Sequence, residues 1–206
     1  MYLDACVSSC TVALRDGAGM SATKHHAEKA SEILGLMDGE DRADWLRFEP
    51  DNSFDEELHR WVERALTQLV LAVGSEEVIF AQAVQDGEKK SGRLVLFTPS
   101  LVVVAEVENV ENNASRPRTT VLGRASLRRV TVLESARIIL DPENMENRHR
   151  VVGWPGEVQI EVDYDGLPAP LVLSGAGISK LDRNDPGAII RLLVVLTDDL
   201  RSSGGA

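Results

Sequence analysis

Apolar residues along the chain change their spacing near Gly74, and this change divides the sequence into two parts. Before Gly74, apolar side chains recur every three or four residues, which is the period of an amphipathic helix. After it, they alternate with polar residues or form short runs rich in Val, Ile and Leu, which is typical of strands. The pattern therefore predicts an α+β protein in which helices precede a set of strands.

The first predicted helix runs from about Thr23 to Met37, where apolar side chains repeat at helical spacing, and Asp38-Gly39 ends it. Residues 1–22 are expected to form a poorly ordered tail, because Gly17 and Gly19 lead into polar sequence. This tail has no basic region ahead of an apolar stretch, so no signal peptide is expected.

The second predicted helix runs from Phe54 to Val73 and has a start and a stop signal. Ser53 and Glu56 fit a capping box, in which each side chain satisfies a free backbone donor of the first turn. Gly74 is suited to the C-terminal cap. The broad apolar face of this helix must pack on another surface.

The β-rich part is organised around a hairpin over Gly92–Glu106. Leu94–Phe97 and Leu101–Ala105 are uninterrupted apolar runs, and Thr98-Pro99-Ser100 between them has turn chemistry. Half-buried strands alternate apolar and polar residues, so these runs predict strands covered on both faces. Large apolar patches rarely stay exposed. We therefore expect the second helix to dock on the outer face of the hairpin through Trp61, Leu66 and Leu69. The alternative is that a second copy of the chain, or another protein, covers this face.

Further strands and a closing helix are predicted around the hairpin. The strands span Val78–Gln85, Thr119–Ala125, Leu127–Leu140 with a break near Glu134-Ser135, Val158–Tyr164 and Leu171–Ser174, and polar loops cover 86–91, 109–117 and 141–150. Alternation in Val158–Tyr164 predicts one buried face and one wet face. The closing helix has Asp185 as N-cap and Pro186 in its first turn. Its apolar stripe between Ile189 and Leu200 is broad enough for two apolar neighbours.

The charge of the chain is strongly acidic except in one segment. A net charge of −11 argues against a nucleic-acid partner, because phosphate contacts need clustered Lys and Arg. Residues 116–150 alone have an excess of basic over acidic residues, eight against four. Five arginines in this segment are candidates for binding carboxylates or phosphates: Arg116, Arg118, Arg124, Arg128 and Arg129. The alternative is internal pairing, for which the twelve acidic residues in 23–75 lie close in sequence.

No pattern in the sequence predicts catalysis, a metal site or a cofactor. Cys6 and Cys10 cannot complete a zinc site without two more ligands, and the four histidines lack the spacing of metal motifs. Ser174-Gly175-Ala176-Gly177 lacks the lysine pattern of a phosphate-binding loop, so a connecting loop is expected there. No stretch reaches the roughly 18 apolar residues of a membrane span. A soluble, cytoplasmic protein is expected.

The succession of elements from about Glu76 to Arg201 resembles the bacterial pleckstrin-homology-like and GRAM-like domains. Two features carry the resemblance: the Gly-x-Leu-Val-Leu-x-Thr pattern of Gly92–Thr98 and the final helix capped by Asp185-Pro186. The resemblance implies a bent seven-stranded barrel plugged at one end by the C-terminal helix. It also implies a non-enzymatic adaptor that binds lipid headgroups, peptides or protein surfaces.

The resemblance also implies a candidate headgroup site. In many eukaryotic members of the family, basic residues around the first hairpin loop hold a phosphoinositide. The matching positions here are Lys89, Lys90 and Arg93. Asp86 and Glu88 in the same loop largely cancel their charge, which favours an ordinary solvated turn.

Together these patterns predict a tail over 1–22, N-terminal helices over 23–74, a pleckstrin-homology-like barrel over 75–201 and a tail over 202–206. The expected function is a non-enzymatic protein-interaction adaptor in a bacterial cytoplasm. Two alternatives remain open. One is peripheral binding to anionic lipid headgroups, although the acidic balance makes membrane contact the weaker expectation. The other is a structural subunit of a homo-oligomer.

Overall fold

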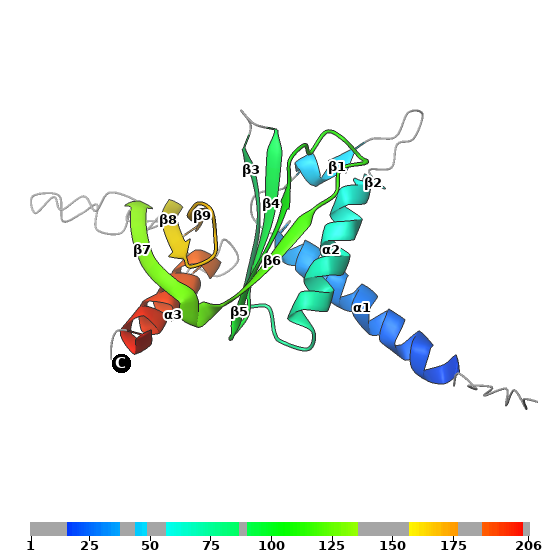
Figure 1. Ribbon diagram of the computed structural model, residues 1–206, viewed down its shortest axis with the longest axis horizontal. Helices are drawn as coiled ribbons and strands as arrows, with labels where there is room; N and C mark the ends of the chain where they lie inside the picture. The colour runs from blue at the N-terminus through cyan, green and yellow to red at the C-terminus, as the bar shows by residue number, and fades with distance from the viewer. Residues whose placement is uncertain are drawn as a thin grey trace, which may run out of the picture.

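The computed structural model describes residues 16–37, 44–48, 57–86, 90–135, 157–176 and 187–203. In these segments the protein has the predicted α+β architecture. Two N-terminal helices lie against a four-stranded antiparallel sheet, and a three-stranded antiparallel sheet and the C-terminal helix lie on its other side (Figure 1). The described part of the chain therefore consists of layers of helices, sheet, second sheet and closing helix.

The two N-terminal helices are α1, Asp16–Met37, and α2, Arg60–Val73. Helix α1 ends where predicted, but it begins within the expected tail. Gly17 and Gly19, which led us to expect a tail, alternate here with Ala18 and Met20, residues of high helix propensity. Residues 1–15, with both cysteines, lie outside the described residues.

Helix α2 begins later than the sequence predicted. A short 3₁₀ turn, η1 (Asp44–Leu46), leads into β1 (Arg47–Phe48), which pairs with β2 (Glu57–Leu58). This pairing holds Glu57 and Leu58 in extended backbone, so the helix starts only at Arg60. The predicted capping box at Ser53 and Glu56 lies outside the described residues. The C-terminal prediction is confirmed, since Gly74 has φ +59° and its N–H bonds the Val70 carbonyl.

The four-stranded sheet contains the predicted hairpin at its centre. Its strands are β3 (Phe80–Asp86), β4 (Ser91–Phe97), β5 (Leu101–Val107) and β6 (Arg118–Gly123), in that spatial order. The turn between β4 and β5 is held by Glu76, whose carboxylate accepts from Thr98 Oγ1 at 2.5 Å and Ser100 Oγ at 2.6 Å. These hydrogen bonds, from Ser100 first and then Thr98, lower the pKa of Glu76.

The second sheet follows a 3₁₀ turn, η2 (Arg124–Ser126), which carries the chain away from β6. Its strands are β7 (Leu127–Glu134), β8 (Glu157–Tyr164) and β9 (Leu171–Ala176), and helix α3 (Ala188–Ser203) follows. The predicted alternation of β8 is confirmed, because Val158, Ile160, Val162 and Tyr164 are buried. The loop expected from Ser174 is wrong for residues 174–176, which continue β9. Gly177, Asp185 and Pro186 lie outside the described residues.

The hairpin is covered on both faces, as its apolar runs predict. On one face, Leu94, Leu96, Val103 and Ala105 belong to a core that includes α1 and α2. On the other, Val95, Phe97, Val102 and Val104 belong to a core shared with the second sheet and α3. Helix α2 contributes Trp61, Leu66 and Leu69 to the first core, each at most 5% exposed, so the predicted docking is confirmed.

The expectation of a closed barrel is not met in the described segments, where the two sheets remain separate hydrogen-bonded units. Edge strands β3 and β9 are linked instead by one side chain. Gln82 Nε2 donates to the Ser174 carbonyl at 2.6 Å, and Ser174 N donates to Gln82 Oε1 at 3.1 Å. An amide side chain thus occupies the place of a backbone partner. On the other side, the turn η2 separates β6 from β7.

Candidate functional site

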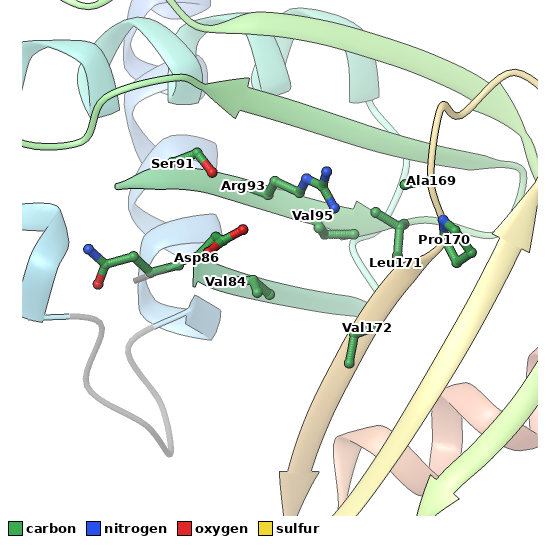
Figure 2. Close-up of a pocket in the computed structure, with 10 residues that line it drawn as sticks. Val84, Asp86, Ser91, Arg93, Val95, Ala169, Pro170, Leu171 and Val172 are labelled. Carbon is green, nitrogen blue, oxygen red and sulfur yellow. The ribbon is translucent and has the colours of Figure 1, made fainter. Parts of the chain in front are cut away.

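An open cavity of about 680 Å³ lies between the two sheets, at the end of β3 and β4 where Asp86 and Ser91 pair. Figure 2 shows side chains of β3 and β4 facing the segment that leads into β9. The cavity is lined by Val84, Gln85, Asp86, Ser91, Arg93, Val95, Ala169, Pro170, Leu171 and Val172. Its volume falls in the range of roughly 300–1,000 Å³ that is usual for ligand sites.

The pairing of β3 with β4 determines which side chains form one wall of the cavity. Val84 is paired with Arg93 and Asp86 with Ser91, so these four side chains share the face of the sheet that looks toward β9. Val95, two residues from Arg93, lies on the same face and is buried. This wall is therefore apolar toward the interior and polar at the mouth.

The turn between β8 and β9 places the opposite wall. Asp165 N donates to the Ser126 carbonyl at 2.9 Å, which fixes the start of the turn to the end of η2. Gly166 has φ +96°, and a Cβ there would lie 3.0 Å from Leu122 of β6. The turn therefore needs glycine for its backbone conformation. Residues 169–172 follow it as the second wall.

The charge at the mouth is largely compensated. Arg93 Nε lies 2.9 Å from Glu106 Oε1, on the neighbouring residue of β5. Asp86 adds a carboxylate to the lining. The cavity thus offers apolar surface with one paired cation and one acid, which suits an apolar group better than a polyanion.

The two predicted headgroup residues that the structure describes, Lys90 and Arg93, are not both part of this cavity. Of these, Arg93 lines it. Lys90 has φ +53°, and its Nζ lies 2.7 Å from Glu111 Oε2, so it is paired with the loop after β5. Lys89 lies outside the described residues.

Arg124 is buried within the fold rather than displayed on the surface. Its Nε and Nη2 donate to both carboxylate oxygens of Asp199 on α3 at 2.6–2.8 Å. Its Nη1 donates to the carbonyls of Thr98 and Pro99, each at 3.1 Å. Arg124 therefore fastens the β4–β5 turn to the C-terminal helix. Burial, together with the charge of Asp199, raises the pKa of the neighbouring Tyr164 hydroxyl.

The other four arginines are divided between the beginnings of two strands. At the start of β7, Arg128 pairs with Asp165, and Arg129 Nη2 lies 3.3 Å from Glu161 Oε1. Near the start of β6, the side chains of Arg116 and Arg118 are exposed and make no hydrogen bond or ion pair with the described residues. The length of β6 separates the two pairs. The five arginines do not form one surface.

The acidic partners of the paired arginines differ from those that the sequence led us to expect. Among the described residues, the partners of Arg124, Arg128 and Arg129 come from β8, the turn after it and α3, and none of them lies in the described parts of 23–75. Cross-strand neighbours lie about 5 Å apart, whereas nearness in sequence places no constraint on where a side chain reaches. Internal pairing is therefore present for these three arginines, with partners other than the acidic residues that nearness in sequence suggested.

No pattern in the sequence predicted the cavity. Its lining combines valines, a proline and an alanine from segments that lie about 80 residues apart in the chain. The described residues hold no group of three or more His, Cys, Asp or Glu side chains placed to bind a metal ion. No described helix is both long and apolar enough to cross a membrane. Comparison of the sequence with protein-family models finds no matching family, and a search of curated proteins finds no match either.

Proposed function

We propose that this protein is a non-enzymatic binding module that recognises a peptide segment of another protein. The cavity between β3–β4 and β9 is the proposed site, and an apolar side chain of the partner would fill it. The observation that carries the proposal is the lining of this cavity. Val84, Val95 and Leu171 offer apolar surface, while Asp86, Ser91 and Arg93 at the mouth offer polar contacts to a backbone.

A pleckstrin-homology-like fold is part of the same proposal. Four antiparallel strands, three further antiparallel strands and a closing helix follow one another in the order that the family resemblance implies. The proposed cavity lies at the ends of β3 and β4, the first two strands of this arrangement. Fold alone does not choose a ligand, so the choice of a peptide rests on the charges of the cavity.

The charges favour a peptide over a phosphorylated headgroup. A polyanion needs several cations that are available together, and here Arg93 is paired with Glu106 and Lys90 with Glu111. An uncharged peptide side chain needs no such set of cations.

Blocking the cavity tests the proposal. Ala169 is exposed in the turn that forms one wall, so Ala169→Trp should fill the cavity without disturbing a strand. Proteins captured from a lysate of the source organism by the wild type would be identified, purified and titrated against the variant. We expect at least about a tenfold weaker dissociation constant, as for loss of a central contact.

Val194→Trp is the matched control, because it adds the same side chain at an exposed position of α3. A captured partner that binds both variants as tightly as the wild type would contradict the cavity as the site. Failure of every captured protein to bind directly after purification would contradict the adaptor function itself.

Anionic membranes are expected not to bind the protein. Each basic residue close to such a surface contributes only about 1 kcal/mol, and a chain with net charge −11 is repelled as a whole. Sedimentation with phosphatidylserine vesicles at physiological salt should leave the protein in the supernatant, as with neutral phosphatidylcholine vesicles. Salt-sensitive binding to the anionic vesicles alone would instead favour the headgroup alternative.

A further inference from the structure

Strand β7 carries exposed apolar side chains and has an unpaired outer edge among the described strands. Val132 is 50% and Leu133 45% exposed, and Val130 is half-buried. Strand β7 pairs with β8 on one side, and no described strand pairs with its other side. Unpaired backbone groups beside apolar side chains form a template for another strand.

The sequence of β7 is complementary to itself in one antiparallel register. With Thr131 at the centre, Val130 stands opposite Val132 of a second copy, Arg129 opposite its Leu133, and Arg128, which also pairs with Asp165 of its own chain, opposite its Glu134. By two-fold symmetry each of these pairs occurs twice, and the two Thr131 side chains face each other. Pairs of β-branched residues, threonine pairs and pairs of opposite charge are the cross-strand combinations that stabilise antiparallel strands.

We propose that two copies of this chain associate through antiparallel pairing of their β7 strands. The two three-stranded sheets would then become one sheet of about six strands across the two-fold axis. Because the two-fold axis would stand perpendicular to the sheet, each face of the sheet in one copy would continue into the same face of the other copy. Val130 and Val132, which pair with the buried Val162 and Ile160 of β8, would therefore extend the apolar face of the sheet into the second copy.

The irregularities of β7 limit the length of the proposed pairing. The β7–β8 pairing shifts between Leu127 and Arg129 and again between Val132 and Glu134, so the stretch from Arg129 to Val132 is the regular part. Bulges at strand ends limit how far an edge can pair. They restrict the backbone pairing to a short segment of β7, and Arg128 and Glu134 flank this segment at its two ends. The inference does not depend on the cavity or on the proposed function.

Charge reversal tests the register directly. Arg128→Glu places acids opposite Glu134 of the second copy, and Glu134→Arg places basic groups opposite Arg128. Each single variant should raise the dimer dissociation constant of the full chain at least about tenfold, since two symmetric pairs turn repulsive. Sedimentation velocity over a wide range of chain concentrations measures this constant.

Two further measurements separate register from damage. The double variant Arg128→Glu/Glu134→Arg should dimerise like the wild type, and an equimolar mixture of the two single variants should form a heterodimer, because every pair is again of opposite charge. Thermal melts should show that all variants fold. A wild-type chain that stays monomeric throughout would overturn the proposal. The proposal would also be overturned if the single variants had the dimer dissociation constant of the wild type. The same holds if the double variant dimerised as weakly as the single variants.

Discussion

Replacing Arg124 with methionine is expected to lower the free energy of unfolding by about 3–5 kcal/mol, the usual cost of removing one partner of a buried ion pair. Arg124 is 8% exposed and donates to both oxygens of Asp199 and to two carbonyls of the β4–β5 turn. Its loss leaves the Asp199 carboxylate and both carbonyls without these donors. Methionine keeps much of the volume, so the effect reports on the hydrogen bonds rather than on a void.

Arg128→Met is the matched control for this prediction. Arg128 also pairs with an aspartate, but both side chains are more than half exposed. Exposed ion pairs contribute roughly 0–1 kcal/mol, so this variant should unfold within about 1 kcal/mol of the wild type. Urea denaturation of the two variants measures both differences. If both variants lost the same free energy of unfolding, this would contradict the conclusion that Arg124 joins the β4–β5 turn to α3.

The position of Arg124 shows why the candidate site could not be predicted from the sequence. Five arginines within 14 residues look like one basic surface when they are read along the chain. The structure divides them because η2 turns the chain between the two sheets, which directs Arg124 inward and separates Arg118 from Arg128. Such a turn depends on contacts between distant segments, and local sequence holds little information about it.

The hairpin illustrates what could be predicted. Its two apolar runs and the turn Thr98–Ser100 indicated strands buried on both faces, and that interpretation is confirmed. It also required a covering element, which α2 supplies. Periodicity is a local property, so it predicts elements and their buried faces reliably. The bridge from Gln82 to Ser174 spans 92 residues and has no local pattern.

Helix starts were predicted less well than helix ends. Gly74 stops α2 because its left-handed backbone conformation is a local property of glycine. The start of α2 is instead decided by the pairing of β1 with β2, which holds Leu58 opposite Arg47. A capping pattern in the sequence competes with such pairing, and tertiary contacts outweigh local propensity where the two differ.

Trp61→Ala is expected to lower the free energy of unfolding by about 3–5 kcal/mol, as for other large side chains removed from a core. Trp61 is 1% exposed, its ring stacks on Trp45 with centroids 5.7 Å apart, and its Nε1 donates to the Val110 carbonyl at 3.0 Å. Trp45 in turn lies against Gly92 of β4, where a Cβ would come within 2.6 Å of the ring. Removing Trp61 therefore loosens both the helices and the hairpin beneath them.

The matched control on the same helix is Leu71→Ala, because Leu71 is 68% exposed. Away from buried features, such a change should stay within about 0.5 kcal/mol of the wild type. Circular dichroism, which follows the backbone, and tryptophan fluorescence, which follows the stack, should give one coincident transition in urea for the wild type and the control. Helices and sheets share one core, so they are expected to unfold together. Two separated transitions, or a Trp61→Ala variant as stable as Leu71→Ala, would show that the helices are an appendage rather than part of the fold.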